Sequence, residues 1–146
     1  MTLEGYERIV GAPLKPGSIV IALTEREELA SVLGRPADAG TTELHPLHAY
    51  IAMQRGIGSS IEDLCAFADF DIDDGPLMGT LDLELHAPLH GDVEYRVEGE
   101  VVDLVRKAGK RMTFDLFTYR ERLIDDHEVA VATATNSFVL PRKVPS

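Results

Sequence analysis

Residues 81–105, LDLELHAPLHGDVEYRVEGEVVDLV, alternate apolar with polar side chains on both sides of a short turn. Leu81, Leu83 and Leu85 are separated by acidic residues, and this period-two pattern is typical of a half-buried strand. The turn at residues 90–92 is followed by a second alternating run, whose phase changes near Gly99. The stretch therefore predicts two antiparallel strands, the second of them with a bulge.

The residues on both sides of this stretch extend the predicted sheet. Residues 112–123 and 127–140 are rich in β-branched and aromatic side chains, and turn sequences precede each of them. Near the N-terminus, residues 18–23 (SIVIAL) form a short β-branched run that favours a buried strand. The sequence therefore predicts five or six antiparallel strands, most of them in the second half of the chain.

Helical signals are confined to the first half of the chain. Thr24 and Glu27 have capping-box spacing before an apolar-periodic run that ends at Gly34. Residues 35–42, RPADAGTT, have loop composition. Helices early in the chain and strands after them predict an α+β fold.

Residues 43–58, ELHPLHAYIAMQRGIG, predict a short apolar helix that begins at Pro46 and ends near Gly56. A second helix is expected after Gly58, where Ser59 and Glu62 have capping-box spacing. Together the two segments are the best candidate for a central helix that the sheet surrounds.

Composition bounds the class of protein. The chain has 146 residues, of which 45% are hydrophobic, which predicts one domain over residues 1–146. Its formal charge of −11 argues against partners that need a basic surface, namely nucleic acid and anionic membranes. No apolar run reaches the roughly 20 residues of a membrane span and no signal peptide is evident, so we expect a cytoplasmic protein. Cys65, the single cysteine, is expected to be a buried, inert thiol.

Several stretches resemble the MaoC-like dehydratase and hydratase family, whose members have the hot-dog fold. Residues 10–34 resemble the family's opening strand and helix, and residues 85–103 resemble its sheet segment with Pro, then Gly-Asp, then V-x-G-x-V. The tail resembles its last hairpin. The resemblance covers most of the chain and implies a five- to six-stranded antiparallel sheet wrapped around a central helix.

The family's active-site motif is Asp, any residue, Asn, Pro, Ile, His. Residues 43–48, ELHPLH, keep its Pro and final His, with Glu43 in place of Asp and His45 in place of Asn. On this alignment Glu43 and His48 are the catalytic pair. Hydration of an enoyl thioester removes one proton and delivers another, and two adjacent titratable groups can do this.

A second alignment is also open. The family has about eighteen residues between the motif His and its central helix, and that count from His48 reaches residues 66–72, where no helix can begin. If ELHPLHAYIA instead begins the central helix, the overhanging segment of the family is reduced to the loop at residues 35–42. The acid–base pair of the family is then missing.

The helix region also supplies the expected substrate-binding residues. A helix break near Gly56 offers an acyl chain a passage and places Arg55 near a phosphate. No metal and no dissociable cofactor is expected, since coenzyme A or an acyl carrier enters as part of the substrate. The substrate-binding residues expected here are His45, Tyr50, Gln54, Arg55 and Gly56.

The resemblance implies a hydratase or dehydratase of enoyl or 3-hydroxyacyl thioesters. Two alternatives are open: a non-catalytic acyl-thioester-binding subunit that partners a catalytic homologue, and an acyl-thioesterase. Hot-dog domains usually pair side by side, so a homodimer or a heterodimer with another hot-dog subunit is expected.

Overall fold

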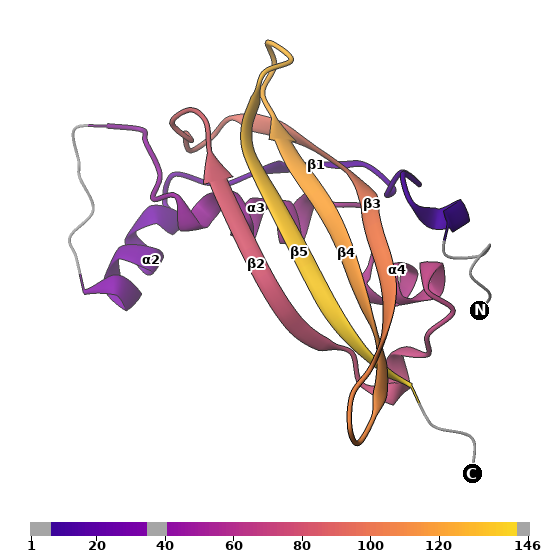
Figure 1. Cartoon of the computed structure of the whole chain (residues 1–146). Helices are drawn as coiled ribbons and strands as arrows, with labels where there is room; N and C mark the ends of the chain where they lie inside the picture. The colour runs from indigo at the N-terminus through magenta and orange to yellow at the C-terminus, as the bar shows by residue number, and fades with distance from the viewer. Residues whose placement is uncertain (1–6, 35–40, 143–146) are drawn as a thin grey trace.

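The computed structural model describes residues 7–34 and 41–142, and their strands form one antiparallel sheet in the order β1-β3-β4-β5-β2 (Figure 1). The long strands β3, β4 and β5 follow one another as hairpins, as the alternating sequence predicts. The short strand β1 forms one edge of the sheet, and β2 forms the other. The strands are β1 Gly17–Val20, β2 Leu77–Leu85, β3 Glu94–Ala108, β4 Thr113–Ile124 and β5 Ala130–Arg142.

Helix α3 (Leu47–Gly56) lies behind the sheet and contacts β1, β3 and β4 (Figure 1). The short helix α4 (Ile61–Phe67) follows it near the other end of the sheet. Helix α2 (Glu25–Leu33) has no buried residue, and a single 3-10 turn, η1 (Ile72–Asp74), leads into β2. This arrangement confirms the α+β class and the hot-dog architecture.

The alternation of the strands separates an inner face from an outer face. On β4 the buried side chains that point toward α3 are Phe117, Tyr119, Glu121 and Leu123. The residues between them, which include Arg120 and Arg122, point to the other side of the sheet. The outer face carries several ion pairs between neighbouring strands. Arg122, for example, binds both oxygens of Glu100 on β3.

The buried apolar residues form two clusters under the two helices. One cluster includes Leu64 and Cys65 of α4 with Phe117 on the sheet, and the other includes Ala52 and Met53 of α3 with Leu123. The prediction that Cys65 is buried is therefore confirmed. Tyr119 belongs to the α4 cluster and Leu123 to the α3 cluster, so Glu121 lies on β4 between the two.

Glycines allow α3 to approach the sheet edge closely. A Cβ added to Gly17 of β1 would lie 1.8 Å from the carbonyl oxygen of Gly56 at the end of α3. A Cβ added to Gly56 would in turn lie 2.7 Å from a methyl group of Val97. Close backbone contact between helix and strand therefore requires glycine at both positions.

Several predicted element boundaries and caps differ from those in the structure by one to a few residues. The first strand ends at Val20, not at residue 23, and Thr24 makes no side-chain cap on α2. The capping box of α4 is formed by Ser60 and Asp63, one residue after the expected pair. Ser59 instead is buried and accepts a hydrogen bond from the backbone N–H of Lys15 (2.8 Å).

Two further expectations also need correction. The two helical segments do not form one central helix, because the chain is extended at Ile57 and only α3 crosses the middle of the sheet. The irregularity that the sequence predicts in β3 is present, but the ladder with β4 shifts between Val101 and Asp103, a few residues after Gly99. Gly99 itself is in regular register, opposite Glu121.

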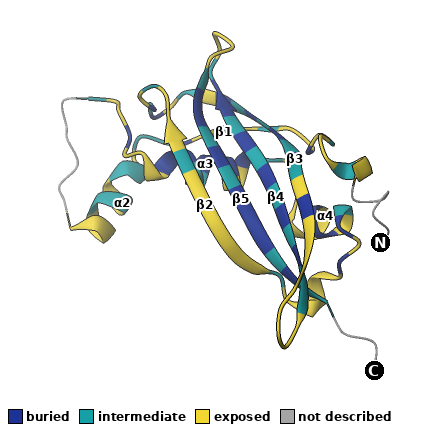
Figure 2. Ribbon diagram, in the orientation of Figure 1, coloured by how far each residue is buried: buried dark blue, intermediate teal, exposed yellow. Residues whose placement is uncertain are grey.

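Strand β2 is paired on one side only and is exposed along most of its length (Figure 2). Its inner-facing residues Leu81 and Leu85 are 41% and 39% exposed, and Met78 is 55% exposed. Helix α3 covers the β1–β3–β4 part of the inner face and leaves the β2 edge open. An unpaired edge with apolar residues is a surface that proteins ordinarily cover.

Candidate functional site

The structure places the two predicted catalytic residues in different surroundings. Glu43 is exposed and forms an isolated antiparallel bridge with His90. His48, in the first turn of α3, is only 2% exposed. Neither ring nitrogen of His48 has a hydrogen-bond partner in the described residues, so the side chains of Glu43 and His48 are not joined there.

Burial also controls the protonation of His48. Desolvation lowers the pKa of the imidazole below 6.5, partly opposed by Glu25 and reinforced by His45 and Arg55. The ring is therefore neutral at pH 7, with one N–H donor and one acceptor nitrogen unpaired. Buried polar atoms without partners reduce stability, so a ring in this state is a feature that needs a functional or structural reason.

Replacing His48 with phenylalanine is expected to stabilise the fold by about 1 kcal/mol at pH 7, because the two unpaired ring nitrogens at this position are then removed. The advantage should grow as the pH falls from 7 to 5, since the unfolded histidine gains a proton near 6.5 and the folded one resists it. Urea denaturation at several pH values measures both effects. His127→Phe, at a side chain that is 83% exposed, is the matched control. A destabilised His48→Phe protein would contradict the description of the ring as unpaired.

The expected substrate-binding residues divide into two groups. His45 accepts a hydrogen bond from the backbone N–H of Leu47 (3.1 Å) at the start of α3, and Arg55 forms an ion pair with Glu25 on α2 (2.8 Å). Gly56 is buried against β1 and β3. Tyr50 and Gln54, in contrast, approach a polar cluster on the inner face of the sheet.

This polar cluster is centred on Glu121 of β4. Its carboxyl Oε1 accepts a hydrogen bond from the amide of Asn136 on β5 (3.3 Å), and Oε2 has no partner among the residues that the structure describes. Gln54 of α3 and Tyr119, two residues before Glu121, line the same cavity, and Gln54 partly offsets the rise in the pKa of the Tyr119 hydroxyl. The charge of Glu121 also contributes to the raised pKa of Tyr50. The cluster therefore joins α3 to the centre of the sheet.

Small residues lie opposite Glu121 in the sheet, and a cavity lies beside its carboxyl group. The residue opposite Glu121 on β3 is Gly99, and the one opposite on β5 is Ala134. A cavity of about 130 Å³ lies beside the carboxyl group. Its lining is Leu14, Gln54, Ile57, Ser59, Ser60, Ile61, Leu64, Tyr119 and Glu121.

The buried carboxyl is held close to neutrality. Desolvation raises the pKa of Glu121 from 4.5 to about 7, since the group is only 1% exposed. Burial also raises the pKa of Tyr119 and Tyr50, and Glu121 adds to both shifts. At pH 7 a large share of Glu121 is therefore the protonated acid, able to donate a hydrogen bond.

A second acid on the same face serves as a comparison. Asp115 is fully buried but forms ion pairs with Arg106 (2.9 Å) and Arg142 (2.8 Å). Arg142 also donates to the carbonyl of Asp69, just after α4, so this group ties the sheet to the helix. In the described part of the chain Glu121 has no such cation. Ion pairs therefore account for the burial of the Asp115 carboxylate, whereas no ion pair accounts for the burial of Glu121 in the described residues.

The prediction from sequence missed Glu121. A signal was present, because β4 carries Phe117, Tyr119, Glu121 and Leu123 at alternate positions. An acid in the apolar phase of a strand predicts a buried carboxyl. The other residues that line the cavity include Leu14, Gln54 and Ile57, which are distant from Glu121 in sequence.

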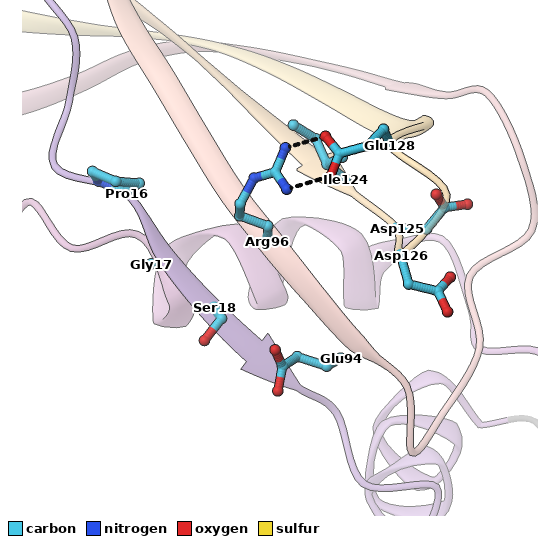
Figure 3. A pocket seen from close by; sticks show the side chains of 9 residues that line it. All are labelled: Pro16, Gly17, Ser18, Glu94, Arg96, Ile124, Asp125, Asp126 and Glu128. Carbon is cyan, nitrogen blue, oxygen red and sulfur yellow. Dashed lines mark hydrogen bonds and ion pairs between the residues drawn. The ribbon is translucent and has the colours of Figure 1, made fainter.

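A larger groove lies on the surface between the start of β1 and the β4–β5 turn (Figure 3). Four acidic residues line it: Glu94, Asp125, Asp126 and Glu128. Among the described lining residues the one cation is Arg96, which donates two hydrogen bonds of 2.9 and 2.7 Å to Glu128. An acidic groove of this kind disfavours the phosphates of coenzyme A. It is therefore a poor candidate for the thioester site.

Two searches of the described residues concern other classes of site. Within residues 7–34 and 41–142, no group of three or more His, Cys, Asp or Glu side chains is arranged to hold a metal ion. In the same residues, no helix has the length and apolarity to cross a membrane.

No family model matches the sequence, and no curated protein matches it. Solved structures do match in fold. A MaoC-like dehydratase from Rhodospirillum rubrum has a TM-score of 0.64 at 14% identity, with 99% of each chain covered. At this identity the likeness concerns the fold alone.

Two of the matching structures are complexes from Mycobacterium tuberculosis. A chain of the ChsH1-ChsH2 complex has a TM-score of 0.69 at 16% identity, with 98% of this chain and 93% of that chain covered. A chain of the HadBC complex, a (3R)-hydroxyacyl-ACP dehydratase, has a TM-score of 0.66 at 15% identity, covering 90% of this chain and 96% of that one. The chain thus has the fold of MaoC-like dehydratases and resembles that family, as its sequence predicts.

Proposed function

We propose that this chain is an acyl-thioester-binding hot-dog subunit that works with a second hot-dog subunit in the hydration or dehydration of acyl thioesters. The observation that carries the proposal is the separation of the expected acid and base: Glu43 is exposed, and His48 is buried without a hydrogen-bond partner in residues 7–34 and 41–142. Binding of the acyl group is supported by the cavity beside Glu121 between α3 and the sheet.

The open edge of the sheet supports a paired subunit. Leu81 and Leu85 on β2 point to the inner face and are partly exposed. A second hot-dog subunit placed edge to edge would pair the free side of β2 and cover these leucines. Two of the matching structures are complexes, which supports a partner of the same fold. The partner is either a second copy of this chain or a homologue.

One observation favours a second candidate, in which this chain is itself the hydratase or dehydratase. His48 is neutral and neither ring nitrogen is paired within the described part of the chain, as expected for a proton acceptor in the absence of substrate. It also lies in the first turn of α3, where backbone N–H groups can stabilise an enolate oxygen. In this second candidate the catalytic acid must be a residue other than Glu43, or Glu43 must move toward His48.

Crotonyl- and octenoyl-coenzyme A distinguish the two candidates. For the purified full chain we expect binding by calorimetry without loss of the conjugated enoyl absorbance. His48→Phe should bind equally well, since the ring then has no chemical role. Loss of absorbance in the wild type that disappears in His48→Phe would replace the leading proposal with the second. Failure of both thioesters to bind would overturn both.

A further inference from the structure

The unpaired carboxyl oxygen of Glu121 has no role in the binding of a plain alkyl chain. It is 1% exposed, lies in a cavity and has no cation beside it in the described residues. An apolar ligand would leave this group unsatisfied. Because unpaired buried polar groups are costly, a site of this kind favours ligands that supply the missing hydrogen bond and disfavours those that do not.

The lining of the cavity is also unusual for an alkyl-binding site. Apolar side chains form part of it, but Ser59, Ser60, Gln54 and Tyr119 add polar groups beside Glu121. Ser59 and Ser60 are held in place by hydrogen bonds from the backbone N–H groups of Lys15 and Asp63. Such a mixture of apolar wall and fixed polar groups is typical of a site that recognises a specific substituent.

The position along α3 indicates which part of the ligand reaches this site. Gln54 is seven residues after Leu47, the first residue of α3, which places it about 10 Å along the helix axis at 1.5 Å per residue. A thioester carbonyl bound at the N-terminus of α3 would therefore be remote from Glu121. The cavity would receive the distal part of the acyl group.

A ligand can enter from the side of the helices. Gln54, Ser60 and Ile61 line the cavity and are themselves exposed, so the mouth opens between the end of α3 and the start of α4. The size of the cavity, about 130 Å³, is close to the roughly 150 Å³ that holds a benzene molecule. It therefore accommodates a short chain segment or a ring.

We propose that this cavity binds an acyl group that carries an oxygen substituent, such as a hydroxyl, far from its thioester, and that the Glu121 carboxyl hydrogen-bonds to that oxygen. This inference rests on the proposed thioester binding and narrows it to a substrate class. Glu121 acts as a specificity-determining residue. Tyr119 and Gln54 form the cavity wall beside it.

Binding of three thioesters tests the inference: octanoyl-, 3-hydroxyoctanoyl- and 8-hydroxyoctanoyl-coenzyme A, each titrated into the full chain by calorimetry. We expect the 8-hydroxy compound to bind roughly ten-fold more tightly than octanoyl-coenzyme A. The 3-hydroxy compound should gain little. In Glu121→Met, of similar size but apolar, octanoyl-coenzyme A should bind at least as well as before and the preference for the 8-hydroxy compound should disappear.

The outcomes separate this inference from the proposed function. Equal binding of octanoyl and 8-hydroxyoctanoyl thioesters by the wild type would overturn the role of Glu121 and leave thioester binding intact. A preference that survives in Glu121→Met would also overturn it. If no thioester binds, the proposed function fails and the inference fails with it. Glu84→Met on exposed β2 is the control for a general effect of the substitution.

Discussion

Glu121→Gln should be more stable than the wild type at pH 8, by about 3 kcal/mol, and about equally stable at pH 4. The folded wild type holds its Glu121 proton up to about pH 7, whereas the unfolded chain releases it near 4.5. Between these values the folded state binds more protons, so wild-type stability falls as the pH rises. The shift corresponds to about 3 kcal/mol at 1.36 kcal/mol per pKa unit.

Urea denaturation of both proteins at half-unit steps from pH 4 to pH 8 measures this difference. Glutamine keeps the size and the hydrogen-bonding capacity of the side chain, so the comparison isolates the charge. The exposed Glu84→Gln should differ from the wild type by less than about 0.5 kcal/mol throughout. A difference between Glu121→Gln and the wild type that does not change with pH would show that Glu121 is not a buried acid in solution.

The large penalty also bears on function. A carboxyl that destabilises the fold at neutral pH is retained at a cost, and stabilising replacements at such positions commonly reduce activity. If Glu121 serves recognition, Glu121→Gln should gain stability and lose selectivity among oxygenated acyl groups. Measuring both properties on one preparation links the pH dependence to the site.

Gly17→Ala should destabilise the protein by about 3 kcal/mol, because the added methyl group meets backbone and not a flexible side chain. The new Cβ would lie 1.8 Å from the carbonyl oxygen of Gly56 and 3.2 Å from the amide nitrogen of Gly58. Relief requires that the end of α3 move away from β1. The amide of Gly58 also donates to the carbonyl of Lys15 (2.8 Å), so this contact would be strained as well.

Thermal unfolding measures the effect, which should be a drop in Tm of roughly 10 °C for a chain of this length. Gly109→Ala is the matched control: it lies in the β3–β4 turn, and its added Cβ would come no closer than 3.2 Å to the carbonyl oxygen of Met112. The control should change Tm by a few degrees at most. A Gly17→Ala protein as stable as the control would show that α3 is not held tightly against β1.

The sequence alone determined the elements of this fold, because helices and strands are encoded by local periodicity and turn residues. The alternation of Leu81, Leu83 and Leu85 fixed β2, and Pro46 and Gly56 bracketed α3 to within one residue. Errors occurred where two local solutions compete. Ser59 and Ser60 are both able to cap α4, and a tertiary hydrogen bond to Lys15 occupies the first of them.

Only the tertiary structure decided the candidate site, since burial and pairing depend on residues that are distant in sequence. The spacing of Glu43 and His48 predicted a pair, but Glu43 forms an isolated bridge with His90 and is exposed, while α3 places His48 in the core. Glu121 lies beside a cavity with a raised pKa because packing desolvates it, and residues distant in sequence, such as Leu14 and Gln54, form the other walls. The alternation of β4 indicates that Glu121 faces the core, but the free space beside it depends on how the helices pack on the sheet, so no local pattern encodes the cavity.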